Sequence, residues 1–184
     1  AQLSPVKGDR VVVLHQLGNH GPNYFERYPP AFKRFTPTCD NPELGQCERG
    51  HIVNAYDNAL LYTDHVLARA IGFLRQQTEY DTALIYVSDH GESLGEKGLF
   101  LHGVPYSIAP QEQTRVPMVM WFSPGFTKDS GLDLACLRRE AAQPASHDDL
   151  FSSVLGLLQV RTEVYRRDGD LFAAFLPPAQ AEEG

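Results

Sequence analysis

The stretch ALIYVSDHGESLGEKGLFLHG, Ala83–Gly103, decides how this chain is organised. Its first five residues, Ala83–Val87, are apolar without alternation, which is typical of a strand buried on both faces of a sheet. Asp89 and His90 follow at the carboxyl end of that strand, where open α/β sheets bind their ligands. A carboxylate and an imidazole are ligands suited to zinc, so this pair is a candidate metal site.

Two further histidines lie in similar local sequences. His20 belongs to the segment GNHGP, Gly18–Pro22, which follows the apolar run Val11–Leu14, and His102 belongs to the segment LHG. These two and His90 are each followed by glycine, which is more often than the composition predicts by chance. Because glycine permits tight turns and close approach to a ligand, we expect His20 and His102 to converge on the first pair. For each histidine, the alternative is a loop residue whose ring is hydrogen-bonded to the backbone and binds no ligand.

These motifs resemble those of the phosphoethanolamine transferases that modify lipid A, a family within the alkaline phosphatase and sulfatase superfamily. The resemblance extends from about Val11 to about Val160. The residues that carry it are Ser88–Glu96, Leu101–Gly103, Gly18–Pro22, Arg27–Pro30, Phe35–Pro37 and Asn54–Asn58. It implies an α/β fold, an alkaline-phosphatase-like three-layer α/β/α sandwich with a mostly parallel sheet, of which residues 1–184 would be the C-terminal portion.

The resemblance also implies an activity, which is the zinc-dependent transfer of phosphoethanolamine from a phospholipid donor to a lipid A phosphate. This is the reaction type associated with polymyxin and colistin resistance. Asp89 and His90 would bind zinc. His20 and His102 would act as catalytic acid or base, or would hold the transferred phosphate or a second zinc ion. Glu92 would form a hydrogen bond to a metal-binding histidine.

In the family that the chain resembles, an N-terminal membrane domain precedes a catalytic domain on the periplasmic face of the Gram-negative inner membrane. An upstream glutamate and a nucleophilic threonine complete the zinc site there, and both would lie before Ala1. The chain has no stretch near the roughly 18 apolar residues that a membrane helix needs. We expect the chain alone to be inactive and to hold zinc weakly, because two ligands leave a tetrahedral ion about half coordinated.

Two alternatives stay open at this point. The chain could belong to another superfamily member, such as a sulfatase or a phosphoglycerol transferase, or it could be a non-catalytic module of the same fold. A substrate assay distinguishes the first alternative from a phosphoethanolamine transferase. The second alternative predicts that no metal binds even when the rest of the domain is supplied. A nucleic-acid partner is not expected, because the net charge is −7 and the isoelectric point is near 5.4.

The three cysteines bear on the compartment. Cys39 and Cys47 bracket a short polar loop that contains proline and glycine, and their spacing can close a small disulfide. A disulfide would fit an oxidising compartment such as the periplasm, whereas two free thiols are the alternative. Cys136 is left over, and its partner, if it has one, would lie outside this chain.

Three apolar runs, Val11–Leu14, Ala83–Val87 and Val116–Phe122, are predicted to form strands of one sheet. A long amphipathic helix is predicted over Glu48–Gln76, packed on that sheet. Its apolar side chains recur at helical spacing, at Val53, Tyr56, Leu60, Leu67, Ala70, Ile71 and Leu74.

The last third of the chain shows helical patterns. A short helix is predicted over Leu132–Ala142, and Ser146–Asp149 (SHDD) reads as a capping box that starts a helix over Leu150–Gln159. Pro177–Gly184 is expected to be disordered.

Overall fold

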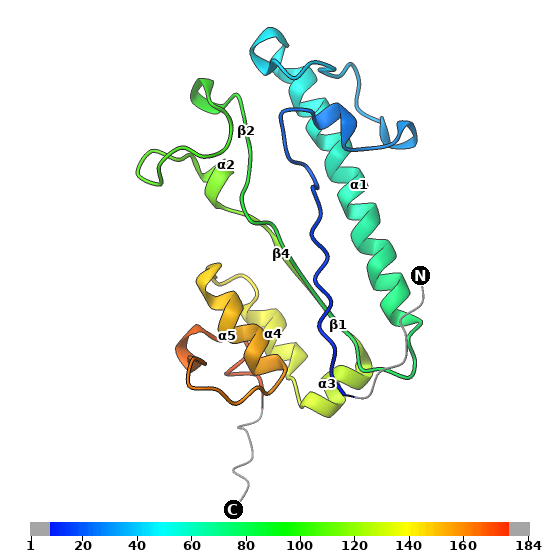
Figure 1. The fold of residues 1–184 in the computed structure, drawn as a ribbon, viewed down its shortest axis with the longest axis vertical. Helices are drawn as coiled ribbons and strands as arrows, with labels where there is room; N and C mark the ends of the chain where they lie inside the picture. Colours follow the sequence, from blue (N-terminus) through cyan, green and yellow to red (C-terminus); the bar gives the residue numbers. More distant parts are fainter. Residues whose placement is uncertain (1–7, 177–184) are drawn as a thin grey trace, which may run out of the picture. The chain divides into compact units, whose positions relative to one another are not determined.

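The computed structural model describes residues 8–176, so the segment Pro177–Gly184, expected to be disordered, lies outside the described residues. The chain forms two compact units, each of which is described by itself (Figure 1). Within the described residues, the first unit comprises residues 8–13, Gln77–Ala83 and residues 122–176, and the second comprises Leu14–Gln76 and Leu84–Trp121.

The second unit is built on helix α1, Arg49–Arg75, which confirms the long helix predicted from the sequence (Figure 1). Its most buried apolar side chains are Ile52, Ala55 and Ala59. Leu60, expected on the buried face, is 48% exposed, so the buried stripe is rotated from the predicted one. The small alanines explain this difference, because they let Tyr24 and its neighbours pack close to the helix backbone.

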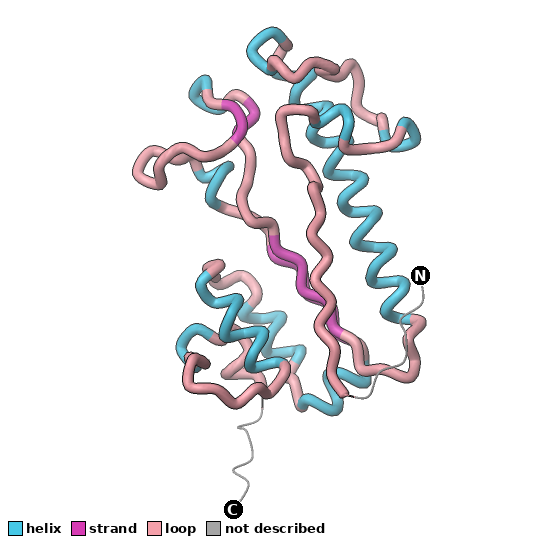
Figure 2. The backbone as a smooth tube through the Cα atoms, viewed as in Figure 1, coloured by secondary structure: helices cyan, strands magenta, loops and turns pink. Residues whose placement is uncertain are grey.

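Two of the three predicted strands pair with each other. Strand β1, Ala83–Val87, and strand β4, Met118–Phe122, are hydrogen-bonded neighbours. The prediction for Val11–Leu14 is wrong, because this segment forms no strand and its residues are between 55% and 85% exposed (Figure 2). An apolar run favours burial, but a strand also needs a neighbour for its backbone groups, and no described strand pairs with this segment.

A small hairpin lies inside the long segment that follows β1. Strand β2, Ser93–Leu94, pairs antiparallel with β3, Phe100–Leu101, with Ser93 opposite Leu101. Arg49, in the first turn of α1, donates a hydrogen bond from Nε to the Leu94 carbonyl oxygen at 3.0 Å and forms an ion pair with Glu96 at 2.6 Å. These contacts hold the hairpin against the start of the long helix.

Shorter helices complete the described chain. They are α2 (Gln111–Thr114), α3 (Pro124–Ser130), α4 (Leu134–Glu140), α5 (Asp148–Leu157) and the 3₁₀ turns η1 (Tyr24–Glu26), η2 (Pro30–Phe32), η3 (Leu44–Gln46), η4 (Glu96–Gly98) and η5 (Arg167–Gly169). Helices α4 and α5 confirm the two predicted helices, although α4 is shorter at both ends than predicted and α5 begins and ends two residues earlier. The capping box is also present, since Asp149 accepts a hydrogen bond from Ser146 N at 2.8 Å and Ser146 Oγ accepts one from Asp148 N at 3.2 Å.

The first unit has its own aromatic core. Phe122 and Phe172 are buried, and their rings meet edge to face at 5.9 Å, while Phe126 stacks on Phe122 at 5.5 Å. Buried serines of α5 fix the chain that follows the helix, because Ser153 Oγ accepts a hydrogen bond from Leu171 N at 2.8 Å. The segment after α5, which shows no periodicity in sequence, is therefore ordered by packing rather than by local propensity.

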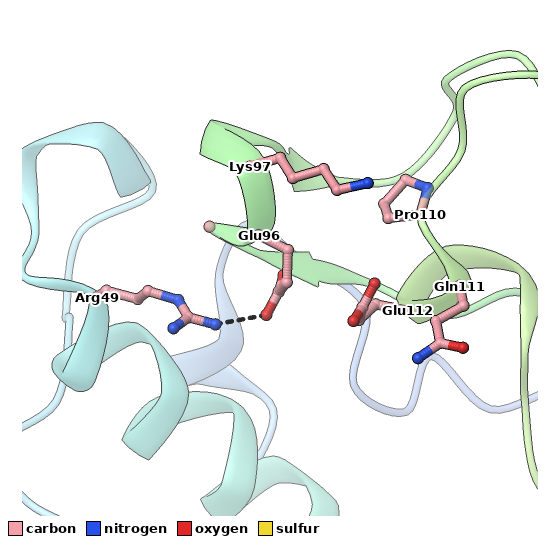
Figure 3. Close-up of a pocket in the computed structure, with 7 residues that line it drawn as sticks. Arg49, Glu96, Lys97, Pro110, Gln111 and Glu112 are labelled. Carbon is pink, nitrogen blue, oxygen red and sulfur yellow. Dashed lines mark hydrogen bonds and ion pairs between the residues drawn. The ribbon is translucent and has the colours of Figure 1, made fainter.

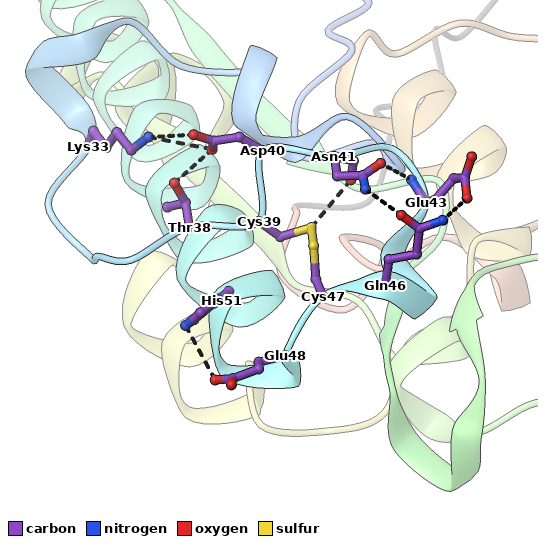
Figure 4. Close-up of a disulfide and its surroundings, with 10 residues drawn as sticks. All are labelled: Lys33, Thr38, Cys39, Asp40, Asn41, Glu43, Gln46, Cys47, Glu48 and His51. Atoms are coloured by element: carbon purple, nitrogen blue, oxygen red, sulfur yellow. Dashed lines mark hydrogen bonds and ion pairs between the residues drawn. A yellow bond between two sulfur atoms is a disulfide. The ribbon is translucent and has the colours of Figure 1, made fainter.

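The predicted disulfide joins Cys39 to Cys47, with a Cα–Cα distance of 5.8 Å (Figure 4). Cys39 is 4% exposed and belongs to the core of the second unit. Its backbone N–H donates to the His51 carbonyl oxygen in α1 at 3.0 Å. The disulfide thereby holds the loop before α1 against that helix, and Cys136 is a free thiol.

Candidate metal centre

Three histidines meet in the second unit. His20, His90 and His102 each place a ring nitrogen within 4.8 Å of the other two. The rings of His90 and His102 stack with centroids 3.8 Å apart, and the ring of His20 stands edge-on to both, at 5.6 Å and 4.9 Å. A cluster of three imidazoles offers nitrogen ligands that suit zinc.

The His–Gly turns orient two of these rings. His20 Nδ1 lies 2.7 Å from the Gly21 carbonyl oxygen, and His90 Nδ1 lies 3.0 Å from the Gly91 carbonyl oxygen. A carbonyl oxygen only accepts, so Nδ1 carries the proton in each neutral ring and Nε2 keeps its lone pair. This is the tautomer in which Nε2 binds a metal, and the repeated His–Gly sequence therefore has a physical role.

His102 reaches the same state through a side chain. Its Nδ1 lies 3.2 Å from Glu92 Oε1. The carboxylate oxygen accepts the hydrogen bond from Nδ1–H, as the backbone carbonyl oxygens do for His20 and His90. The hairpin explains the contact, because the pairing of Ser93 with Leu101 leaves Glu92 and His102 opposite each other at its open end. Leu101 has a φ of 63°, a left-handed conformation that is costly for leucine and reverses the chain just before His102.

Glu92 connects the two histidine loops. Its side chain is only 4% exposed, and Oε1 accepts hydrogen bonds from both the Gly21 N–H and His102 Nδ1, each at 3.2 Å. Oε2 accepts a hydrogen bond from the Tyr24 hydroxyl at 2.9 Å. Burial and the negative charge of Glu92 raise the pKa of Tyr24, so the hydroxyl stays protonated and donates.

The His20 turn has further supports, which reasoning from the sequence missed. Thr63 in α1 donates from Oγ1 to Asn19 Oδ1 at 2.8 Å, and the Asn19 amide donates to the Tyr56 carbonyl oxygen at 3.4 Å. Arg27 Nε donates to the His20 carbonyl oxygen at 2.9 Å. These partners are up to 44 residues apart, and no local pattern in the sequence signals them.

Gly91 lets the turn that carries His90 pack closely against another backbone segment. A Cβ at this position would lie 1.9 Å from the Glu112 carbonyl oxygen, and the Gly91 N–H donates to the Gln113 carbonyl oxygen at 2.9 Å. The close approach that the sequence indicated here is thus made to the backbone that follows β3. The contact fixes the turn beside His90 on the side of helix α2.

Asp89 is placed differently from the three histidines. Its side chain is 81% exposed, and the described residues that form the three-histidine cluster do not include it. Its Oδ2 lies 3.9 Å from His90 Nε2. Two ligand bonds of about 2.0–2.2 Å each span that distance, so one ion can bind both atoms.

The second unit also contains a hollow of about 550 Å³, which is not the candidate site (Figure 3). Its lining includes Arg49, Glu96, Lys97 and Glu112, and none of the three clustered histidines. Arg49 points to Glu96 and forms an ion pair with it, so its charge is already neutralised within the protein. The candidate chemistry therefore belongs to the histidine cluster and its buried glutamate.

The sequence profile of the sulfatase family matches residues 1–160 of this chain. The chain belongs to the sulfatase family. Phosphoethanolamine transferase EptA of Escherichia coli K12 is 47% identical to it over 171 residues, which cover 92% of this chain and 31% of that protein. The chain thus spans about a third of the length of the curated relatives that it matches.

Solved structures give the same result for the fold. The soluble domain of lipooligosaccharide phosphoethanolamine transferase A from Neisseria meningitidis is similar with a TM-score of 0.86 and 48% identity, covering 90% of this chain and 50% of that one. The C-terminal periplasmic domain of EptC from Campylobacter jejuni gives a TM-score of 0.76 and 45% identity, covering 84% of this chain and 48% of that one. These similarities confirm the α/β fold of the alkaline phosphatase and sulfatase type, and the family resemblance, both predicted from the sequence. Within residues 8–176, no helix has the length and apolar character to cross a membrane.

Proposed function

We propose that this chain takes part in the transfer of phosphoethanolamine from a phospholipid to a phosphate group of lipid A. The observation that carries the proposal is the cluster of three imidazoles, each with Nδ1 held by an oxygen and Nε2 available. The relative named for phosphoethanolamine transfer supports it, at 47% identity over 92% of the chain.

In this proposal Asp89 and His90 hold a zinc ion. Their ligand atoms are 3.9 Å apart at the end of β1, and the carboxylate is open to solvent on its other side. A zinc ion bound there supplies positive charge that neutralises phosphate oxygens and lowers the pKa of an attacking hydroxyl. Because a tetrahedral ion takes about four ligands, the others come from residues outside this chain.

His20 and His102 act on the transferred phosphate, or hold a second metal ion, from the side facing His90. Each presents Nε2 as the free nitrogen, so each can take a proton from an attacking oxygen or return one to a leaving oxygen. Glu92 keeps His102 in the required tautomer and stabilises the imidazolium that forms when Nε2 is protonated.

Residues 1–184 serve as the C-terminal portion of a larger catalytic domain in this proposal. The nucleophile and a membrane domain lie outside this chain, and the domain works on the periplasmic face of the inner membrane. The disulfide between Cys39 and Cys47 supports an oxidising compartment. The similar domain from Campylobacter jejuni is described as periplasmic.

A hybrid enzyme tests the proposal. This chain replaces the 171 aligned residues of Escherichia coli EptA, and membranes that contain the hybrid receive labelled phosphatidylethanolamine. We expect lipid A to gain one phosphoethanolamine group, which mass spectrometry detects. His65→Ala, an exposed substitution on α1, is the matched control and should leave transfer unchanged.

Variants of the hybrid separate the roles. Asp89→Ala should lower both bound zinc and transfer, whereas His102→Ala should lower transfer and largely spare the zinc at Asp89. If His102→Ala removes that zinc as thoroughly as Asp89→Ala, the division of roles is wrong. Transfer from phosphatidylglycerol alone would instead identify a phosphoglycerol transferase, cleavage of an aryl sulfate a sulfatase, and a hybrid without metal a non-catalytic module.

A further inference from the structure

Tyr24 lies in the core of the second unit, directly beside the histidine cluster, and none of the roles above uses it. It is 1% exposed, and its ring meets that of Tyr56 edge to face at 5.4 Å. Its hydroxyl donates a hydrogen bond to Glu92 Oε2 at 2.9 Å. A tyrosine hydroxyl that is buried and bonded to a carboxylate fixes the orientation of that carboxylate.

The two oxygens of Glu92 have different partners. Oε1 accepts from the Gly21 N–H and His102 Nδ1, whereas Oε2 accepts from Tyr24. The last torsion of a glutamate side chain is soft, so a carboxylate held through one oxygen can rotate. The bond from Tyr24 prevents that rotation and keeps Oε1 between the two histidine loops.

The packing around Gly21 points to the same arrangement independently. A Cβ at this position would lie 2.7 Å from the Tyr24 hydroxyl and 2.5 Å from Leu101 Cδ2. The turn that carries His20 therefore rests directly on the tyrosine hydroxyl and on the residue that precedes His102. Glycine is the residue whose lack of a side chain permits this contact.

We infer that Tyr24 is a positioning residue that acts through Glu92, fixing the direction of His102 Nε2 and the placement of the His20 turn for a metal ion or phosphate group bound between them. This inference rests on the proposed function of the cluster. It assigns no chemistry to Tyr24 itself, whose hydroxyl keeps its proton throughout.

The test uses the full 184-residue chain and Co²⁺ as the probe. Tyr24→Phe removes only the hydroxyl, and we expect Co²⁺ affinity to fall about 3- to 10-fold, less than the roughly 10- to 100-fold expected for Glu92→Gln. Tyr56→Phe is the matched control, because it removes a neighbouring hydroxyl that is not bonded to Glu92, and affinity should change less than about 2-fold. Thermal unfolding with a chelator present measures stability separately.

A second readout needs no metal. Long-range ¹H–¹⁵N correlation spectra of the metal-free chain, at a pH where the imidazoles are neutral, report which nitrogen of His102 carries the proton. We expect the Nδ1–H form in the wild type and in Tyr56→Phe, and a mixture of tautomers in Tyr24→Phe. The spectra are recorded well below the unfolding temperature of each variant, because Tyr24→Phe leaves the buried Glu92 Oε2 without its donor and should also lower stability.

Either of two results would overturn the inference. One is a Tyr24→Phe chain with wild-type Co²⁺ affinity and an unchanged His102 tautomer. The other is an equal loss of affinity in Tyr24→Phe and Tyr56→Phe that follows their loss of stability. If the wild-type chain, which lacks the zinc ligands proposed to lie outside it, binds no measurable Co²⁺, the tautomer measurement alone decides whether Tyr24 positions His102.

Discussion

Glu92 and Asp40, both in the second unit, show what burial does to similar hydrogen bonds. Glu92 accepts from a backbone N–H, a hydroxyl and an imidazole, and Asp40 accepts from the Thr38 hydroxyl at 2.7 Å and the Lys33 ammonium at 3.0 Å. Their side chains are 4% and 53% exposed, respectively. The donors to Asp40 are within seven residues of it, whereas two donors to Glu92 are 68 and 71 residues away. The buried carboxylate of Glu92 therefore connects segments that are distant in sequence. The exposed carboxylate of Asp40 binds residues of its own loop (Figure 4).

The largest effect is expected when each carboxylate is removed in turn, which tests whether burial sets the difference between Glu92 and Asp40. Glu92→Ala leaves the Gly21 N–H and the Tyr24 hydroxyl buried without their acceptor, so we expect a loss of about 3 kcal/mol in the free energy of unfolding. Asp40→Ala removes exposed contacts that water replaces, and should cost less than about 1 kcal/mol. Urea unfolding at neutral pH measures both. Equal losses in the two variants would show that burial does not set the difference.

The distinction also explains what could be predicted from the sequence. Helix α1, strands β1 and β4, the disulfide and the capping box at Ser146 are all encoded in short patterns of residues. Val11–Leu14 has a strand-like pattern as well, but pairing depends on a neighbour that no local pattern supplies. The rotated stripe on α1 has a similar cause, because the face that is buried depends on which segments pack on it.

The candidate site divides in the same way. The three His–Gly turns and Glu92 could be identified from the sequence because the partners of the imidazole Nδ1 atoms are close in sequence. They are the carbonyl oxygens of the following glycines for His20 and His90, and the carboxylate of Glu92 for His102. Tyr24, Asn19 and Thr63 hold these turns from a distance, and nothing in the surrounding sequence marks them. The contact between Gly91 and the Glu112 carbonyl is also hidden, since a glycine in a turn does not reveal what approaches it.

Removing the disulfide tests what holds the loop that contains Asp40. The loop that contains Asp40 is closed by Cys39 and Cys47, eight residues apart, so cross-linking limits the freedom of the unfolded chain. We expect Cys39→Ala/Cys47→Ala to lower the free energy of unfolding by about 2.5 kcal/mol. Urea unfolding should show a similar decrease for wild type reduced with dithiothreitol. A double variant as stable as the oxidised chain would mean that the loop is held by its packing instead.

The smallest expected effect concerns the charge of Asp40. The Thr38 hydroxyl bond, followed by the Lys33 bond, lowers the pKa of Asp40 below its ordinary value. A carboxyl with a lowered pKa in the folded state stabilises the protein above its unfolded pKa of about 3.9, and loses that contribution as the pH falls through the folded value. Asp40→Asn should therefore cost a few tenths of a kcal/mol at neutral pH.

The difference between wild type and Asp40→Asn should then disappear at a pH well below about 3.9, where the carboxyl of the wild type is protonated too. Added salt at neutral pH should reduce the Lys33 contribution to the difference, because both side chains are exposed and screening is effective. Urea unfolding of the pair at two pH values and two salt concentrations measures this directly. A difference that persists at acid pH would come from the shape of the side chain and not from its charge, and Asp40 would then resemble Glu92 in holding its loop by fixed geometry.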